Sequence, residues 1–325
     1  MQPSSKLFIR TGALIAALIG VANAQEYPGK PARIIVGYPP GGANDIVARI
    51  AAQKLSQFWT QQFVVENRPG ASGVIGTEVV ARAAPDGYTL GLVSLSPVVL
   101  SRFAYAKLPY DSLTDFAPIT PLAMAPMLIT VHPALPAANL KALIALAKTQ
   151  PGKLDFAVSG SGGMTHMVLE LFKSAAGVNV QSIVYKGASP ALTDTLAGQV
   201  QGIVEAFPAL YPTVKQGRLR GVAVSSERRM NLLPEVPTAI EQGVPALNAV
   251  NWFGIVAPAR TPRAVVDKLH AALTQMNAQA DVKARYTALG LEPMTVATPD
   301  AYAALIKTEI ARWGRIAQQA GVKPQ

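Results

Sequence analysis

Two glycine-rich turns are the residues of this chain best suited to bind a charged group. The first has the sequence PPGG at residues 39–42, after a β-branched run at 34–36 and before apolar residues with helical spacing from Ile46 to Leu55. A helix that begins directly after two glycines directs its unpaired N–H groups and the positive end of its dipole into open space. The first turn is therefore predicted to bind an anion.

A second turn, with the sequence SGSGG at residues 159–163, repeats this arrangement. It follows a predicted strand at 154–158 and precedes a predicted helix that begins at Met164. A third unit has a strand at 183–185, a short turn, and a helix with Pro190 at its first position. Two α/β lobes that each present a helix N-terminus can hold one ligand in the cleft between them.

Strand and helix signals alternate along the rest of the chain. Short buried strands are predicted at 63–65 and 89–93, each next to turn-forming residues. Helices with one apolar face are predicted near 140–147, 265–273 and 305–313. Alternation of this kind indicates the α/β class. The chain has 325 residues, half of them apolar, which is enough for two lobes with separate cores.

The N-terminus has the pattern of a secretory signal peptide. Lys6 and Arg10 form a basic region, an apolar stretch follows, and Ala22 and Ala24 form the small-x-small site that signal peptidase reads. We expect a signal peptide at 1–24, cleavage after Ala24, and export of the mature chain. Because the sequence has no cysteine, neither a lipid anchor nor a disulfide is expected.

The charge of the chain is positive but diffuse. The formal net charge of +10 falls to +8 once Lys6 and Arg10 are removed. The remaining basic residues are scattered, and the densest cluster is the pair Arg228 and Arg229. This distribution argues against nucleic-acid binding, which needs a basic stripe. It suits small anions, because a diffuse positive field raises the encounter rate without selecting the ligand.

Side chains that could perform catalysis are sparse. The three histidines, His132, His166 and His270, are widely separated and lack the spacing of a metal site. No Gly-x-Ser-x-Gly elbow is present, and the glycine turns lack both the Walker lysine and the three-glycine dinucleotide fingerprint. We therefore expect no catalytic residue, no metal and no cofactor. A secreted enzyme acting on a small acid is the less favoured alternative.

Six ordered motifs carry a resemblance to a known family. They are PGGAND (40–45), VENRPG (65–70), APDGYTL (84–90), PGKL (151–154), YKG (185–187) and LAGQV (196–200). With Trp252-Phe253-Gly254 and Trp313-Gly314, the chain resembles the Bug family of Bordetella uptake gene receptors. These are the periplasmic substrate-binding proteins of tripartite tricarboxylate transporters. The match covers essentially the whole mature chain.

The resemblance implies a two-lobed type II periplasmic binding protein fold with a ligand cleft between the lobes. Lobe 1 would comprise residues 25–126 and 250–325, and lobe 2 residues 127–249. Receptors of this family close on a small carboxylate without an enzymatic step. The resemblance implies that this chain does the same and delivers the carboxylate to membrane permease subunits. It implies a periplasmic monomer. A periplasmic sensor that signals to another partner would need the same clamp and is an alternative.

The family typically holds the ligand carboxylate through main-chain N–H groups and bridging waters from two loops. Carried onto this chain, the resemblance assigns Tyr38, Pro40, Gly41, Gly42, Asn44 and Asp45 to the first loop, and Ser159, Gly160, Ser161, Gly162 and His166 to the second. Several roles are open: Asp45 could cap its helix or contact the ligand, His166 could pack or bind, and Tyr38 could simply cover the turn. Ser94, at the end of the strand at 89–93, could add a hydroxyl, and Tyr185 belongs to the YKG motif.

The chain departs from the family pattern at residues 201–208, which read QGIVEAFP where many relatives have an Asp-rich strand. Glu205 keeps a carboxylate on a longer arm, and Phe207 adds an aromatic surface. Glu205 could receive the ammonium of an amino acid, whereas Phe207 could stack on an aromatic acid. The sequence leaves both ligand classes open.

Overall fold

The computed structural model describes residues 27–319 and residue 324, so the predicted signal peptide at 1–24 lies outside the described residues. The strands are β1 (Ala32–Val36), β2 (Phe63–Asn67), β3 (Thr89–Ser94), β4 (Phe116–Val131), β5 (Asp155–Val158), β6 (Gln181–Val184), β7 (Gly202–Ala206), β8 (Arg220–Val224), β9 (Val250–Pro258) and β10 (Glu292–Pro293). The helices are α1 (Ala43–Trp59), α2 (Val74–Ala81), α3 (Ser101–Ala104), α4 (Leu140–Thr149), α5 (Met164–Ala176), α6 (Ala188–Leu196), α7 (Phe207–Lys215), α8 (Arg263–Ala278), α9 (Ala280–Ala288) and α10 (Pro299–Gln319). Short turns of other helical geometry are η1 (Ala71–Gly73), η2 (Ser96–Leu100) and η3 (Pro245–Leu247).

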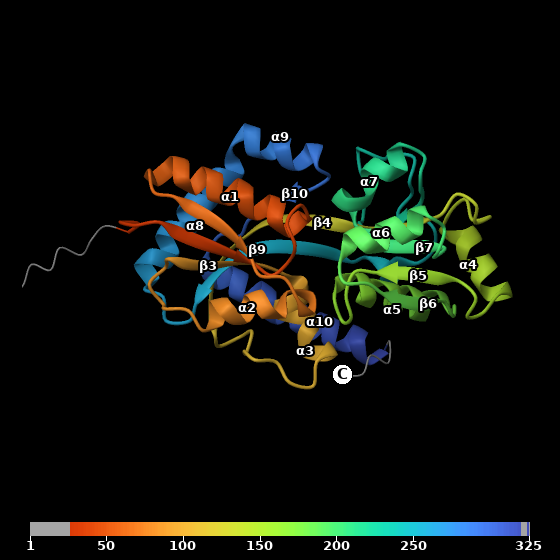
Figure 1. The fold of residues 1–325 in the computed structure, drawn as a ribbon, viewed down its shortest axis with the longest axis horizontal. Helices are drawn as coiled ribbons and strands as arrows, with labels where there is room; N and C mark the ends of the chain where they lie inside the picture. Colours follow the sequence, from red (N-terminus) through yellow and green to blue (C-terminus); the bar gives the residue numbers. More distant parts are fainter. Residues whose placement is uncertain (1–26, 320–323, 325) are drawn as a thin grey trace, which may run out of the picture.

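Two groups of strands meet at one long strand, β4. On one side the order is β2-β1-β3-β9-β4, with β1, β2 and β3 parallel and β9 antiparallel to both of its neighbours. On the other side β4 pairs with β7 and β8, and β7, β5 and β6 run parallel. The partner of β4 changes from β9 at Pro126 to β7 at Met127. The molecule therefore has two lobes joined by crossing strands (Figure 1).

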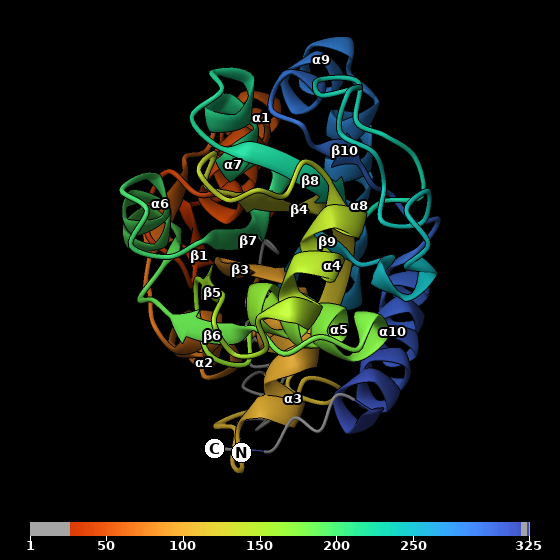
Figure 2. The ribbon, with the colours of Figure 1, turned by 90° about the vertical axis from the view of Figure 1, so that its right-hand side faces the viewer.

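Helices cover both faces of each group of strands, as the alternating sequence pattern requires. In the first lobe α1 and α8 pack on one face, where Ile50, Leu55 and Leu273 are buried against strand residues such as Ile34. In the second lobe α4 and α5 lie on one side of β5, β6 and β7, and α6 lies on the other (Figure 2). The long helix α10 packs against β4, η2 and α5, so it contacts both lobes.

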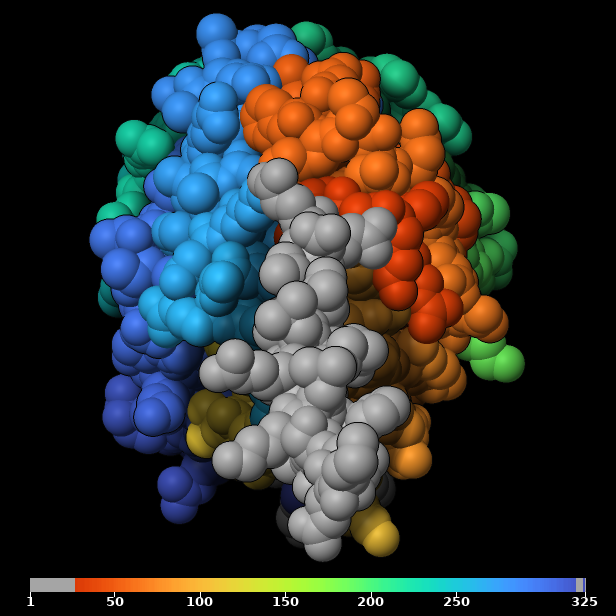
Figure 3. All heavy atoms as spheres, turned by 90° about the vertical axis from the view of Figure 1, so that its left-hand side faces the viewer, coloured from red at the N-terminus to blue at the C-terminus, as the bar shows by residue number. Residues whose placement is uncertain are grey.

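The first lobe is built from both parts of the chain that flank the second. Figure 3 shows segments of the N-terminal third in orange beside C-terminal segments in blue on one face of the molecule. The ion pair of Lys54 on α1 with Asp281 on α9, at 2.6 Å, joins these two parts. Among the described residues, no helix is long and apolar enough to cross a membrane.

The predicted elements are confirmed, with a correction at the start of one helix. The strands at 63–65 and 89–93 and the three apolar helix faces are present, and Asn139 caps α4 by accepting the N–H of Ala142 at 2.9 Å. The position of Pro190 was wrong: α6 begins at Ala188, so Pro190 is its third residue. Proline is tolerated there because the N–H groups of the first turn have no acceptor within the helix.

Candidate functional site

A cavity of about 340 Å³ lies between the two lobes, beside the carboxyl ends of several strands. Its walls come from the β1–α1 turn, η1, η2 and β9 of the first lobe, and from the β5–α5, β6–α6 and β7–α7 junctions of the second. This volume is near the lower end of the range of ligand pockets, which begins at about 300 Å³. The cavity therefore suits a small solute.

Four helices begin at this cavity: α1, α5, α6 and α7. In α1 the first helical hydrogen bond runs from Ile46 N to Gly42 O, so the N–H groups of Ala43 and Asn44 have no acceptor within the helix. Gly42 has extended backbone angles, and an added Cβ there would meet nothing within 4 Å. The β1–α1 turn thus exposes backbone donors and a positive dipole end, as the sequence predicted for an anion site.

The predicted site residues divide into two groups. Those that line the cavity are Tyr38, Pro40, Gly42, Asn44, Ser159, Gly160 and Glu205. Those that do not line it are Gly41, Asp45, Ser94, Ser161, Gly162, His166, Tyr185 and Phe207. Several of the second group shape the loops instead, through bonds that the sequence alone does not show.

The two glycine loops are held by the same kind of hydrogen bond, from a loop N–H to a side chain in the first turn of the following helix. In the first, the Gly41 N–H donates to the Asp45 carboxylate at 3.0 Å. In the second, the Gly162 N–H donates to Nδ1 of His166 at 3.0 Å. In each case the acceptor is the third residue of the helix and the donor lies just before the N-cap. Both side chains thus accept a hydrogen bond from a loop N–H, and neither lines the cavity.

Asp45 is nearly fully buried and has further partners. Its carboxylate accepts hydrogen bonds from Arg49 Nε at 2.8 Å and Asn67 Nδ2 at 3.0 Å. Burial acts to raise its pKa, but the bonds from Arg49, Gly41 and Asn67 outweigh burial and lower the pKa of Asp45 below its ordinary value. Of the two roles left open by the sequence, this geometry supports the capping role.

Direct contacts join the lobes across the cavity. Ser72 Oγ in η1 donates to Ser161 O in the second lobe at 3.0 Å, and the Met164 N–H of α5 donates to Ser96 Oγ at 3.0 Å. Gly162 has φ +64°, and an added Cβ would collide with Ala104 of the first lobe. The loop at 159–163 can approach the first lobe this closely because it lacks side chains at such positions.

Tyr38 and Ser94 support the contact made by Ser72. The Tyr38 hydroxyl donates to Ser72 O at 2.7 Å and lies 3.3 Å from Ser94 Oγ. Ser72 has φ +53°, a left-handed conformation that is costly for a residue other than glycine. Tyr38 therefore both lines the cavity and fixes the strained turn that presents the Ser72 hydroxyl.

Glu205 is a buried acid in the wall of the cavity. It lies in β7 and is 8% exposed. Its Oε1 accepts the Ala206 N–H at 2.8 Å, while Oε2 has no hydrogen-bond partner among the described residues. Burial raises the pKa of Glu205 above its ordinary value, against the opposing effects of the Ser159 hydroxyl and the Ala206 N–H.

Neither Phe207 nor Tyr185 lines the cavity. Phe207 is fully buried, stacks on Tyr211 with ring centroids 5.7 Å apart, and packs against Gly290 of the first lobe. The chain turns from β7 into α7 at this point, which directs Phe207 into the core while Glu205 remains at the cavity. The Tyr185 hydroxyl donates to Asp194 at 2.8 Å, within its own β6–α6 unit.

Some residues of the cavity wall were not predicted. They are Ser72, Ser96, Lys186, Ser189 and Asn251, among others. Ser72 sits between two glycines in the sequence GASG (70–73), and small residues between glycines are a signal of close backbone approach. Ser96 belongs to the Ser94-Leu95-Ser96 segment, from which the sequence favoured Ser94. The turn into η2 after β3 brings Ser96 to the cavity instead.

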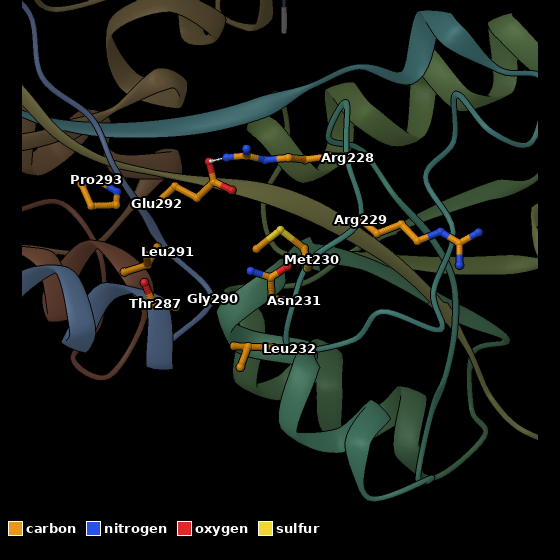
Figure 4. Close-up of a pocket in the computed structure, with 10 residues that line it drawn as sticks. All are labelled: Arg228, Arg229, Met230, Asn231, Leu232, Thr287, Gly290, Leu291, Glu292 and Pro293. Atoms are coloured by element: carbon orange, nitrogen blue, oxygen red, sulfur yellow. Dashed lines mark hydrogen bonds and ion pairs between the residues drawn. The ribbon is translucent and has the colours of Figure 1, made fainter.

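A second hollow of about 430 Å³ lies between the loop at 228–232 and the segment at 287–293 (Figure 4). Its two sides belong to different lobes, and Arg228 bridges them by an ion pair with Glu292 at 3.1 Å. Arg228 is largely exposed, so this ion pair contributes little to stability. Within the part of the chain that the structure describes, no cluster of His, Asp or Glu side chains could hold a metal ion.

Comparisons with known proteins place this geometry in a family. A model described as "Tripartite tricarboxylate transporter family receptor" matches residues 47–322. Protein BugT of Bordetella pertussis is 36% identical over 318 residues, covering 98% of this chain and 96% of that protein. The structure of R. palustris Rpa4515 with adipate has a TM-score of 0.88 at 33% identity, over 92% of this chain and 100% of that chain. MatC from Rhodopseudomonas palustris with bound malate has a TM-score of 0.83 at 29% identity, over 89% and 99%.

The fold and the cavity define a two-lobed solute-binding receptor of the periplasmic binding protein class. The chain belongs to the tripartite tricarboxylate transporter receptor family, and the resemblance to the Bug proteins is confirmed. It is a binding receptor and not an enzyme.

We expect Gly42→Val to weaken solute binding at least ten-fold while leaving the fold intact. The new side chain would project into the cavity, where an added Cβ meets no atom within 4 Å, and would cover the donors of α1. Titration calorimetry measures the affinity, and circular dichroism checks the fold. Gly42→Ala should give a smaller loss, and equal affinity for all three proteins would contradict this role of the turn.

A second prediction concerns Glu170 on α5, which accepts bonds from Lys173 Nζ at 2.9 Å and Ser182 Oγ at 2.7 Å and lies 3.5 Å from His166 Nε2. Burial acts to raise its pKa, but these partners outweigh it and lower the pKa of Glu170 from 4.5 to about 2. The ionised form therefore stabilises the fold above pH 4.5, and this contribution is lost as the pH falls toward about 2.

Glu170→Gln should consequently lower the free energy of unfolding at pH 7 by about 1 kcal/mol. The difference from the wild type should shrink between pH 4.5 and about 2. Urea denaturation at pH 7, 4 and 3 measures both quantities. A difference that does not change with pH would show that the charge of Glu170 has no role in stability.

Proposed function

We propose that this protein is a periplasmic receptor that closes on a small carboxylate and delivers it to the membrane permease subunits of a tripartite tricarboxylate-type transporter. The observation that carries the proposal is the convergence of helix N-termini from both lobes, α1 from the first and α5 and α6 from the second, on one small cavity. Unpaired backbone N–H groups at several helix ends form a site for an anionic group.

The energy available from such contacts is sufficient. A hydrogen bond to a charged group contributes roughly 1.5–3 kcal/mol, and a micromolar ligand needs about 8 kcal/mol in total. Four or five backbone donors would reach that value without an arginine. Relatives with bound adipate and malate support a carboxylate as the solute of this chain.

Export and lobe organisation complete the proposal. The N-terminal pattern supports a signal peptide cleaved after Ala24, so that the mature chain works in the periplasm as a monomer. We propose the lobe boundaries 25–126 with 250–325, and 127–249. The change in the partner of β4 between Pro126 and Met127, and the start of β9 at Val250, support these boundaries.

Closure follows from contacts that both lobes make to one ligand. An open form would lack the Ser72–Ser161 bond and one half of the anion site. A ligand that touches both lobes therefore binds the closed form more tightly and shifts the population toward it.

The proposal is tested by thermal-shift screening of the mature chain from Gln25. The panel contains mono-, di- and tricarboxylates and amino acids, because a ligand that binds only the folded state raises the unfolding midpoint. We expect at least one small carboxylate to raise the midpoint in a concentration-dependent manner. A response to neutral analogues alone, such as the corresponding amides or alcohols, would overturn the proposal.

Ser72→Ala should weaken binding about five-fold, because one neutral hydrogen bond contributes about 1 kcal/mol to the closed form. The φ of +53° is equally costly for alanine, so fold stability should change little. Ser226→Ala is the matched control, since its hydroxyl donates to Arg228 O within the same loop at 2.7 Å. Unchanged affinity of Ser72→Ala would show that this bond does not assist closure.

A further inference from the structure

We infer that His166 is a positioning residue that holds the loop at 159–163 in its binding conformation only while its imidazole ring is neutral, so that protonation of His166 weakens solute binding. This inference rests on the proposed function and adds a pH dependence to the same site. His166 does not line the cavity, so it acts on the solute through the loop.

The hydrogen bond from Gly162 defines the state of the ring. A backbone N–H can only donate, so Nδ1 of His166, at 3.0 Å from the Gly162 nitrogen, accepts and carries no proton. The other ring nitrogen, Nε2, then carries the proton and lies 3.5 Å from Oε1 of Glu170. A protonated ring has an N–H at both nitrogens. It would direct one of them at the Gly162 N–H, and the hydrogen bond would be lost.

The two glycine loops differ at this point. In the first loop the Gly41 N–H is accepted by the Asp45 carboxylate, whose pKa lies below its ordinary value because of its hydrogen bonds, so this acceptor stays ionised at mildly acidic pH. In the second loop the acceptor is a histidine, the side chain whose charge ordinarily changes between about pH 5 and 8. A fall in pH through this range therefore removes the support of the second loop and leaves that of the first.

Contacts with the first lobe leave the second loop little room to adapt. Gly162 is buried, and an added Cβ would collide with Ala104. The neighbouring Ser161 O accepts the Ser72 hydroxyl at 3.0 Å. A form with separated lobes lacks both contacts, so its loop can rearrange around a protonated ring. In the closed form the Gly162 N–H would instead remain buried without an acceptor, which is costly. Closure on a solute therefore favours the neutral ring.

Glu170 is the acid that the structure places at the ring. Its pKa is lowered to about 2 by its hydrogen bonds from His166, Lys173 and Ser182, against the effect of burial, so Glu170 is ionised over the whole range in which a histidine titrates. The pairing of Glu170 with Lys173 Nζ, at 2.9 Å, compensates its charge. The His166 side chain is 18% exposed, so its proton exchanges with solvent.

The elements packed against α5 contribute few other charges. The segments η2, η3 and β6 have no charged side chain, and β5 has Asp155 at the end away from the loop. On α10, Glu309 and Arg312 pair with each other at 3.6 Å. On β7, Glu205 lines the cavity, and burial raises its pKa. Ionisation of Glu205 as the pH rises would repel an anion, so its effect on binding has the opposite sign to that of His166.

Titration calorimetry at pH 6, 7 and 8 tests the inference with malate and adipate, which remain largely ionised in this range. The mature chain is refolded to remove bound solute. We expect at least one of the two acids to bind about five-fold or more weakly at pH 6 than at pH 8. His166→Asn, whose Oδ1 can accept the Gly162 N–H without titrating, should lose this pH dependence. His166→Ala, which lacks the acceptor, should bind weakly at all three pH values.

His132→Asn is the matched control. Nδ1 of His132 also accepts a backbone N–H, from Ala134 at 3.2 Å, but His132 does not line the cavity. This variant should keep the pH dependence of the wild type. Circular dichroism checks the fold of each variant. If His166→Asn does not fold, the affinities of the wild type at pH 6 and pH 8 still decide the sign of the effect.

Hydrogen–deuterium exchange of the segment 159–163 gives a readout without solute. At pH 6 this segment should exchange faster in the wild type than in His166→Asn, and at pH 8 the two should agree. Equal exchange at both pH values, or tighter binding by the wild type at pH 6, would overturn the inference, and binding of malate or adipate would leave the proposed receptor intact. Failure of both acids to bind, with the expected exchange, would support the role of His166 in the loop and contradict the proposed function for these acids.

Discussion

The constraint on which the site depends is that the first turn of a helix has backbone N–H groups with no acceptor inside the helix. At this cavity several such turns face one another across two lobes. Each lobe supplies only some of these N–H donors. An anionic solute that accepts hydrogen bonds from all of them must contact both lobes at once, so solute binding depends on how far apart the lobes lie.

The loops that present these donors must leave the N–H groups unobstructed and must also keep a fixed backbone conformation. Glycine leaves them open, since Gly42 and Gly162 have no side chain to block the solute or the opposite lobe. Asp45 and His166 fix them from behind, each by accepting the N–H that precedes the N-cap. The sequence left both side chains open between a supporting role and a ligand contact, and the bonds they make are those of a support. A buried acid in such a loop need not repel an anion, because its charge is compensated by Arg49.

The fold could be predicted from the sequence to a large extent. Strand and helix alternation, the two glycine turns and the order of six motifs indicated a two-lobed α/β protein, and the family is confirmed. The site was predicted less completely, for physical reasons. The direction of a side chain at the end of a strand depends on where the next turn or helix begins. For this reason Ser96 lines the cavity and Ser94 does not, and Phe207 lies in the core. Ser72 reaches the cavity only because a strained turn of the first lobe meets the second lobe, a tertiary contact that local patterns do not contain.

The second hollow, of about 430 Å³, has a consequence for movement of the lobes. Its two walls, around Arg228 and around Glu292, belong to different lobes, so a rotation of one lobe against the other alters the spacing of these walls as well as that of the cavity. Because the exposed ion pair of Arg228 with Glu292 contributes little to stability, it offers little resistance to such a change of spacing.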